Sequence, residues 1–107
     1  MAFYELRQYK VLPGKMDAFV ALMEAEIIPF QVANGMVITG SYRGETDSSV
    51  YVWMRRFESE AQRIAQYQAV YESAQWKSVI APRIPELLDT SGIVVTRLQP
   101  TANSVAQ

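Results

Sequence analysis

The sequence contains neither cysteine nor histidine among its 107 residues. Without cysteine, the chain has no disulfide, no thiol nucleophile and no zinc site of the Cys/His type. Without histidine, it has no imidazole general base and no histidine ligand for haem iron. Catalysis would have to use carboxylates, hydroxyl groups, lysine or arginine, or a cofactor that these groups position. Because no pattern in the sequence indicates such a cofactor or a metal site, we expect neither.

The sequence also lacks a strong net charge and a long hydrophobic run. Ten Lys and Arg residues against eleven Asp and Glu residues give a formal net charge of −1, too weak to attract nucleic acid. No apolar run approaches the roughly 18 residues that a membrane span needs, and the first residues do not resemble a signal peptide. The isolated glycines have the wrong spacing for a phosphate-binding loop. We therefore expect a cytoplasmic protein that binds neither nucleic acid nor membranes.

The composition is that of an ordinary globular protein. Half of the residues are hydrophobic and a fifth are charged, and the length suits a single core. We expect one domain over residues 1–99. Residues 100–107 have too few large apolar side chains to stay ordered alone, so we expect a flexible tail there.

Residue patterns predict the element order β-α-β-β-α-β. The first helix carries an apolar stripe from Met16 to Ile27 and should kink or end at Pro29. The second begins at a capping box of Ser59 and Gln62, extends to about residue 74 and can add a short helical turn before the next strand. Period-two alternation predicts strands at 3–10, 35–44, 50–57 and 92–98.

This order is typical of the ferredoxin-like split βαβ fold of the α+β class. Right-handed crossovers place the strands at 3–10 and 50–57 in the centre of a four-stranded antiparallel sheet. The other two strands lie at its edges, and both helices cover one face.

The strand at 50–57, VYVWMRRF, has apolar side chains on both faces. We expect the aliphatic face with Val52 to pack against the helices, and the aromatic face with Trp53 to lie on the opposite side. That aromatic patch is larger than monomers usually expose, so we expect a homodimer that packs sheet against sheet and closes a barrel. The predicted barrel interior is lined by Glu5, Arg7, Tyr9, Tyr51, Trp53 and Arg55.

Several stretches occur together that resemble one known family. They are YELRQY, PGK, YVWMRRFES, AQRIAQYQAVYESAQW and IAPRIPELL, and they extend from residue 3 to about residue 98. In this combination the chain resembles the NIPSNAP family of dimeric α+β barrel proteins. The matching positions are Tyr4, Glu5, Arg7, Pro13, Gly14, Trp53, Arg63 and Trp76.

The resemblance implies a half-barrel that dimerises through its sheet, and it implies little chemistry because the family is largely uncharacterised. Proteins with the same barrel include cofactor-free monooxygenases, muconolactone isomerase-like enzymes and haem-dependent proteins. The lack of histidine argues against the histidine-ligated haem proteins. Fold analogy does not choose among the others.

Two arginines are predicted on the same face of adjacent strands. Arg7 and Arg55 can bind the carboxylate or enolate oxygen of a small substrate, because a guanidinium group matches such oxygens. Alternatively, they form an ion-pair network in which Glu5 neutralises one of them.

Aromatic residues give a second candidate site. Trp53, Tyr67, Tyr71 and Trp76 can line a pocket for a flat ligand or form part of the core. The full set of candidate ligand-binding residues is Arg7, Tyr9, Trp53, Arg55, Tyr67, Tyr71 and Trp76.

Three functions remain open from the sequence. The first is binding of a small, partly apolar molecule, as a metabolic accessory protein. The second is a cofactor-independent monooxygenase or isomerase acting on an aromatic or lactone substrate. Its catalytic candidates are Arg55, Trp53 and Glu5, with Glu5 as base if burial raises its pKa. The third is a structural or protein-interaction module that pairs through an edge strand.

Overall fold

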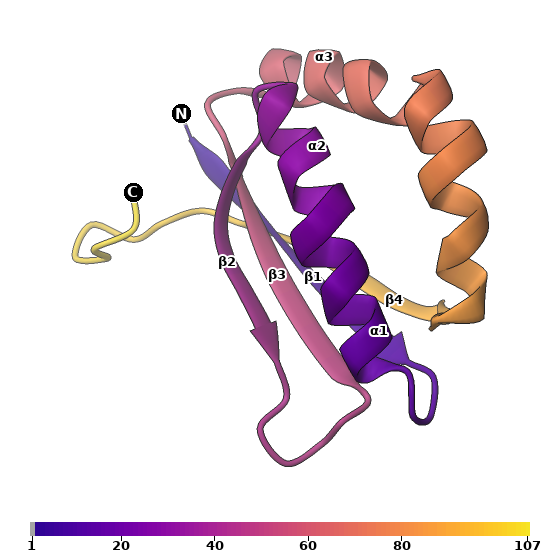
Figure 1. Ribbon diagram of the computed structural model, residues 1–107. Helices are drawn as coiled ribbons and strands as arrows, with labels where there is room; N and C mark the ends of the chain where they lie inside the picture. The colour runs from indigo at the N-terminus through magenta and orange to yellow at the C-terminus, as the bar shows by residue number, and fades with distance from the viewer. Residues whose placement is uncertain (1) are drawn as a thin grey trace.

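One antiparallel sheet of four strands forms in the order β2-β3-β1-β4, in a computed structural model that describes residues 2–107 (Figure 1). The predicted order, with β1 and β3 in the centre, is confirmed, as is the α+β fold class. The last strand begins at Leu88 instead of residue 92, because Leu88 and Asp89 pair with Val11 and Lys10. The strands are β1 (Phe3–Val11), β2 (Val37–Arg43), β3 (Val50–Phe57) and β4 (Leu88–Leu98).

The first helical segment continues past Pro29. It consists of α1 (Met16–Leu22), the π-helical turn η1 (Met23–Ile27) and α2 (Ile28–Ala33). A proline lacks the N–H that the helix ladder uses, and the π-helical turn directly before it changes the hydrogen-bond spacing there. The helix is followed by Gly35 with φ of 90°, a conformation that glycine adopts without strain.

The second helical segment begins at the predicted cap and is longer than predicted. The Ser59 hydroxyl oxygen accepts a hydrogen bond from the Gln62 N–H at 3.1 Å, and the Gln62 side chain accepts from the Glu58 N–H at 2.7 Å. The segment contains α3 (Glu60–Tyr71), the π-helical turn η2 (Gln75–Ile80) and the 3-10 helix η3 (Ala81–Glu86).

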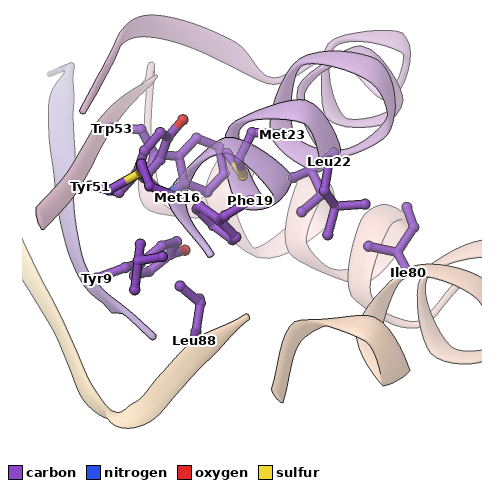
Figure 2. Close-up of a cluster of buried hydrophobic side chains, with 11 residues drawn as sticks. Tyr9, Met16, Phe19, Leu22, Met23, Tyr51, Trp53, Ile80 and Leu88 are labelled. Atoms are coloured by element: carbon purple, nitrogen blue, oxygen red, sulfur yellow. The ribbon is translucent and has the colours of Figure 1, made fainter. Parts of the chain in front are cut away.

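Both helical segments cover one face of the sheet, and it is the aromatic face. Along β3, Tyr51, Trp53, Arg55 and Phe57 are buried, and they alternate with partly exposed residues. Trp53 is only 1 % exposed and belongs to the core that the first helical segment closes (Figure 2). The predicted assignment of the two faces is therefore wrong. The side chains predicted to line a barrel between two copies lie inside one chain, between its sheet and its own helices.

Aromatic packing explains why the faces are arranged in this way. The Phe19 ring of α1 meets the rings of Tyr51 and Tyr9 edge to face, with centroids 5.0 and 5.9 Å apart. Large rings fill the space between a sheet and a helix layer and bury more apolar area than valine does. β-strand propensity does not predict which face of β3 packs against the helices, because both faces are apolar.

The opposite face of the sheet has no helix over it, and we call it the open face. Tyr42 is 59 % exposed there and Val94 is 57 % exposed. Figure 1 shows the C-terminal tail on this side, where the Gln107 backbone oxygen accepts from Arg56 Nε at 2.7 Å. The open face carries Leu6, Tyr42, Val52, Met54 and Val94.

Within residues 2–107, none of the helices has the length and apolar character that crossing a bilayer requires. The cytoplasmic location expected from the sequence stays a prediction.

Candidate functional site

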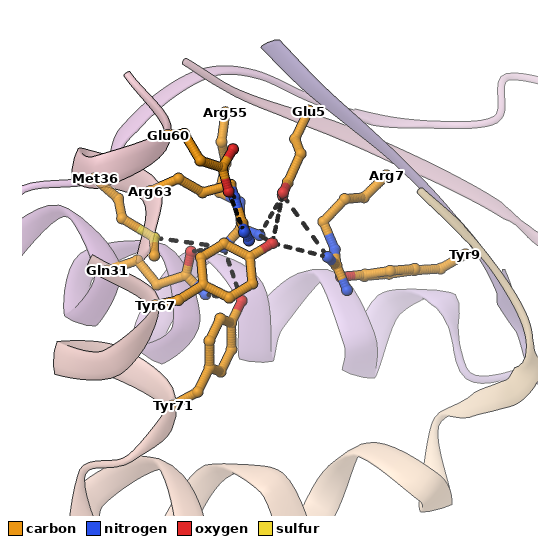
Figure 3. A network of polar contacts seen from close by, with 10 residues as sticks. All are labelled: Glu5, Arg7, Tyr9, Gln31, Met36, Arg55, Glu60, Arg63, Tyr67 and Tyr71. Carbon is orange, nitrogen blue, oxygen red and sulfur yellow. Dashed lines mark hydrogen bonds and ion pairs between the residues drawn. The ribbon is translucent and has the colours of Figure 1, made fainter. Parts of the chain in front are cut away.

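Arg55 lies at the centre of a buried polar network (Figure 3). Its Nη2 donates to Glu5 Oε1 at 2.6 Å and to the Tyr67 hydroxyl at 2.8 Å. Its Nη1 donates to the Tyr71 hydroxyl at 2.7 Å and to Gln31 Oε1 at 3.0 Å. The third nitrogen, Nε, has no hydrogen-bond partner among residues 2–107. Arg55 is 0 % exposed, so its charge is balanced almost entirely by these contacts.

Strand register and helix spacing bring this network together. Glu5 of β1 pairs directly with Arg55 of β3, which places both side chains on the helix-covered face. Tyr67 and Tyr71 are one turn apart on α3, and both hydroxyls reach the guanidinium group. The Arg55 guanidinium also lies 4.8 Å from the centroid of the Trp53 ring, within cation–π range.

The Glu5 carboxylate is held in its ionised form. Burial raises its pKa, but the hydrogen bond from Tyr67 and the charge of Arg55 lower it more, so the net shift is downward. Tyr67 donates within 2.7 Å of both Glu5 oxygens, and burial raises the pKa of Tyr67 to about 12. A carboxylate with a lowered pKa is a weak general base. The condition under which Glu5 was expected to act as a base is not met.

Arg7 is less completely paired than Arg55. Its Nε donates to the Tyr9 hydroxyl at 2.8 Å, and its Nη1 is a longer 3.5 Å from the Tyr67 hydroxyl. The closest approach of Arg7 to Glu5 is 3.8 Å, and its side chain is 17 % exposed. Within residues 2–107, Arg7 Nη2 makes no hydrogen bond.

A cavity of about 120 Å³ lies beside Arg7, between the sheet and the helices. Five of its lining residues carry polar groups: Arg7, Tyr9, Trp53, Tyr71 and Trp76. The other walls are apolar and come from the first helical segment, from η3 and from β4. These apolar lining residues are Phe19, Met23, Ile27, Ile84, Leu88 and Ile93.

The structure therefore divides the predicted site residues into two groups. Arg55, Tyr67 and Glu5 belong to the buried network and do not line the cavity. The candidates that line the cavity are Arg7, Tyr9, Trp53, Tyr71 and Trp76.

Sequence reasoning missed Gln31, which completes the network. Gln31 is 0 % exposed, and its amide bridges Arg55 Nη1 and the Tyr71 hydroxyl. It lies four residues after Ile27 and so continues the apolar stripe of the first helix. A polar residue at a core position of a helix indicates a buried polar partner, and this signal was available in the sequence.

Comparison with known proteins identifies relatives over nearly the whole chain. The sequence model of the NIPSNAP family matches residues 4–103. No curated protein sequence is significantly similar to the chain.

Solved structures share the fold along the full length. A NIPSNAP family protein from Agrobacterium tumefaciens superposes with a TM-score of 0.88 at 23 % identity, covering 100 % of both chains. A second NIPSNAP family protein of unknown function from the same organism has a TM-score of 0.88 at 22 % identity, covering 99 % of this chain and 94 % of that one. An uncharacterised NIPSNAP domain protein from Burkholderia xenovorans has a TM-score of 0.84 at 20 % identity, covering 95 % and 97 %.

Proposed function

The chain belongs to the NIPSNAP family, and we propose that it binds a small, partly apolar molecule in the cavity between its sheet and its helices. The observation that carries the proposal is a cavity of about 120 Å³ between the sheet and the helices, with a charged group at its wall. Protein interiors are close-packed, and voids larger than a water molecule are few. An apolar cavity of roughly 150 Å³ is enough to take up benzene, so this one suits a single small ring or a short branched chain.

The surroundings of the cavity support binding more than turnover. Glu5 is ionised and hydrogen-bonded to Arg55, and neither residue lines the cavity. Two of the three catalytic candidates therefore have no contact with a ligand bound there. A role as a metabolic accessory protein that holds a small molecule is consistent with this arrangement. No contact in the described residues favours the monooxygenase, isomerase or interaction-module alternatives.

A thermal unfolding experiment tests occupancy of the cavity. Benzene, as a neutral probe of suitable size, should raise the Tm, because a molecule that binds only the folded state stabilises it. In Ile93→Phe the added ring fills the cavity, and the shift should disappear. Val32→Phe, at an exposed position of α2 that lines neither the cavity nor the open face, is the matched control and should keep the shift. An equal Tm shift in all three proteins, or none in any, would contradict the proposal.

We also propose that two copies associate through the open face. Leu6, Val52 and Met54 form its centre, with the more exposed Tyr42 and Val94 on the flanking strands. A second copy presents the same apolar surface, and a two-fold arrangement would cover both. Light scattering should give twice the mass of one chain for the wild type and the mass of one chain for Val52→Asp. A single-chain mass for the wild type at micromolar concentration would end this proposal.

A further inference from the structure

We propose that the molecule bound in the cavity is a small carboxylate with an apolar body, held by Arg7; this rests on the proposed function of the cavity. Two hydrogen-bond donors of the cavity-lining residues have no acceptor among the residues described, Trp53 Nε1 and Arg7 Nη2. Trp53 is 1 % exposed, and its indole Nε1 is buried without a hydrogen-bond partner. Arg7 Nη2 makes no hydrogen bond with any residue from 2 to 107.

Two hydroxyl groups add to this surplus of donors. The Tyr9 oxygen accepts from Arg7 Nε, and the Tyr71 oxygen accepts from Arg55 Nη1. A phenol carries one proton of its own to donate, and neither proton has an acceptor among the residues described. Burial raises the pKa of Tyr9, so its proton is retained at neutral pH. A ligand that completes this site has to bring acceptors.

The charge balance around Arg7 favours negatively charged acceptors. Arg7 and Arg55 supply two positive charges, and Glu5 supplies the one negative charge that faces them, which leaves one positive charge in excess. Glu5 is committed to Arg55 at 2.6 Å and is only within 3.8 Å of Arg7. A largely buried charge without a close partner is costly, and an anion beside Arg7 removes that cost.

Size and shape restrict the anion further. A carboxylate is planar and matches a guanidinium fork, whereas a dianionic phosphate would face only one uncommitted cation here. Apart from the indole N–H of Trp76, the remaining wall is apolar and includes Phe19, Met23 and Leu88. The cavity volume of about 120 Å³ admits a short branched chain or a small ring and excludes nucleotides and larger acids.

Matched ligands separate this inference from the proposed function. We expect 3-methylbutanoate to bind the wild-type protein at neutral pH, and the isosteric neutral 3-methylbutanamide to bind at least about tenfold more weakly, since hydrogen bonds to a charged group are the stronger ones. In Arg7→Met the two affinities should become equal. Arg43→Met, which removes an exposed arginine paired with Asp17, should keep the difference. Calorimetric titration measures all of these affinities.

The outcomes are distinct. If benzene raises the Tm but the acid binds no better than the amide, the carboxylate inference is wrong and the cavity still binds ligands. If acid and amide differ equally in wild type and Arg7→Met, the anion does not bind at Arg7. If neither benzene nor the acid binds, both proposals fail.

A measurement without a substitution covers the case in which Arg7→Met does not fold. Trp53 and Trp76 are the two tryptophans of the chain, so a nitrogen-15 spectrum has two indole N–H signals. The carboxylate should shift the Trp53 signal in the way a new acceptor at Nε1 does, and the amide should shift it less. An unchanged Trp53 signal at saturating acid would overturn the inference.

Discussion

Arg55 and Arg7 lie on neighbouring strands and on the same face of one sheet, yet their surroundings differ. Arg55 lies beneath α3, where Tyr67 and Tyr71 reach both terminal nitrogens. Arg7 lies on β1 opposite Trp53, two residues after the position on β1 that faces Arg55. It lines the cavity instead of lying beneath α3. Residue type therefore does not distinguish a structural arginine from a ligand-binding one. The two are distinguished by how many hydrogen-bond partners each already has in the protein.

The largest expected effect is loss of the Arg55 side chain. Arg55→Met leaves the Glu5 carboxylate buried without its main charged partner, which typically costs about 3–5 kcal/mol. Urea unfolding should show this decrease in the free energy of unfolding. If Arg55→Met is as stable as the wild type, the network is not structural and the contrast with Arg7 breaks down.

Acid should remove the same stabilisation. The pKa of Glu5 is lowered from its ordinary value of 4.5 in the folded protein, so its contribution is present above that value and is lost as the pH falls through the lowered pKa. The stability difference between wild type and Glu5→Gln should therefore be largest near pH 7 and shrink below about pH 4.5. A difference that is constant from pH 7 to pH 2 would mean that the folded and unfolded pKa values are equal.

Loss of one tyrosine hydroxyl should cost more stability beside Arg55 than beside Arg7. Tyr67→Phe deletes the donor to both Glu5 oxygens and an acceptor for Arg55, and should cost about 1.5–3 kcal/mol because charged groups lose a hydrogen bond. Tyr9→Phe deletes one acceptor for the more exposed Arg7 and should cost about 1 kcal/mol. Denaturant unfolding measures the loss of stability in each variant. A larger loss in Tyr9→Phe than in Tyr67→Phe would contradict this prediction.

The smallest effect on stability is expected from Arg7→Met. This variant loses one short hydrogen bond, to Tyr9, and removes the excess positive charge, so the two effects oppose each other and should leave a net change within about 1 kcal/mol. A loss as large as that of Arg55→Met would show that Arg7 is as structural as Arg55.

Much of the fold follows from local patterns in the sequence. The strand order follows from the β-α-β-β-α-β sequence of elements and crossover handedness, and the second helix begins where Ser59 and Gln62 form a cap. The helix-covered face of β3 was not predictable in this way. Period-two alternation separates two sets of side chains, but when both sets are apolar it does not say which one meets the helices.

The candidate site was predictable in its residues but not in its geometry. Side-chain type and position on a strand or helix were enough to name Arg7, Trp53 and Tyr71. The cavity depends on how residues far apart in the sequence, such as Phe19 and Leu88, pack together in the core. A local sequence pattern does not predict where such packing leaves a volume unfilled.

Arg7 lines the cavity and has a terminal nitrogen, Nη2, that is unpaired among residues 2–107 and available for an anion, whereas Arg55 does not line the cavity and has both terminal nitrogens paired. A crystal structure of the protein grown with 3-methylbutanoate tests this contrast most directly. We predict the carboxylate within hydrogen-bond distance of Arg7 Nη2, with the branched chain against Phe19 and Met23. An unoccupied cavity at saturating acid, or a carboxylate bound to Arg55 in place of Glu5, would contradict the account.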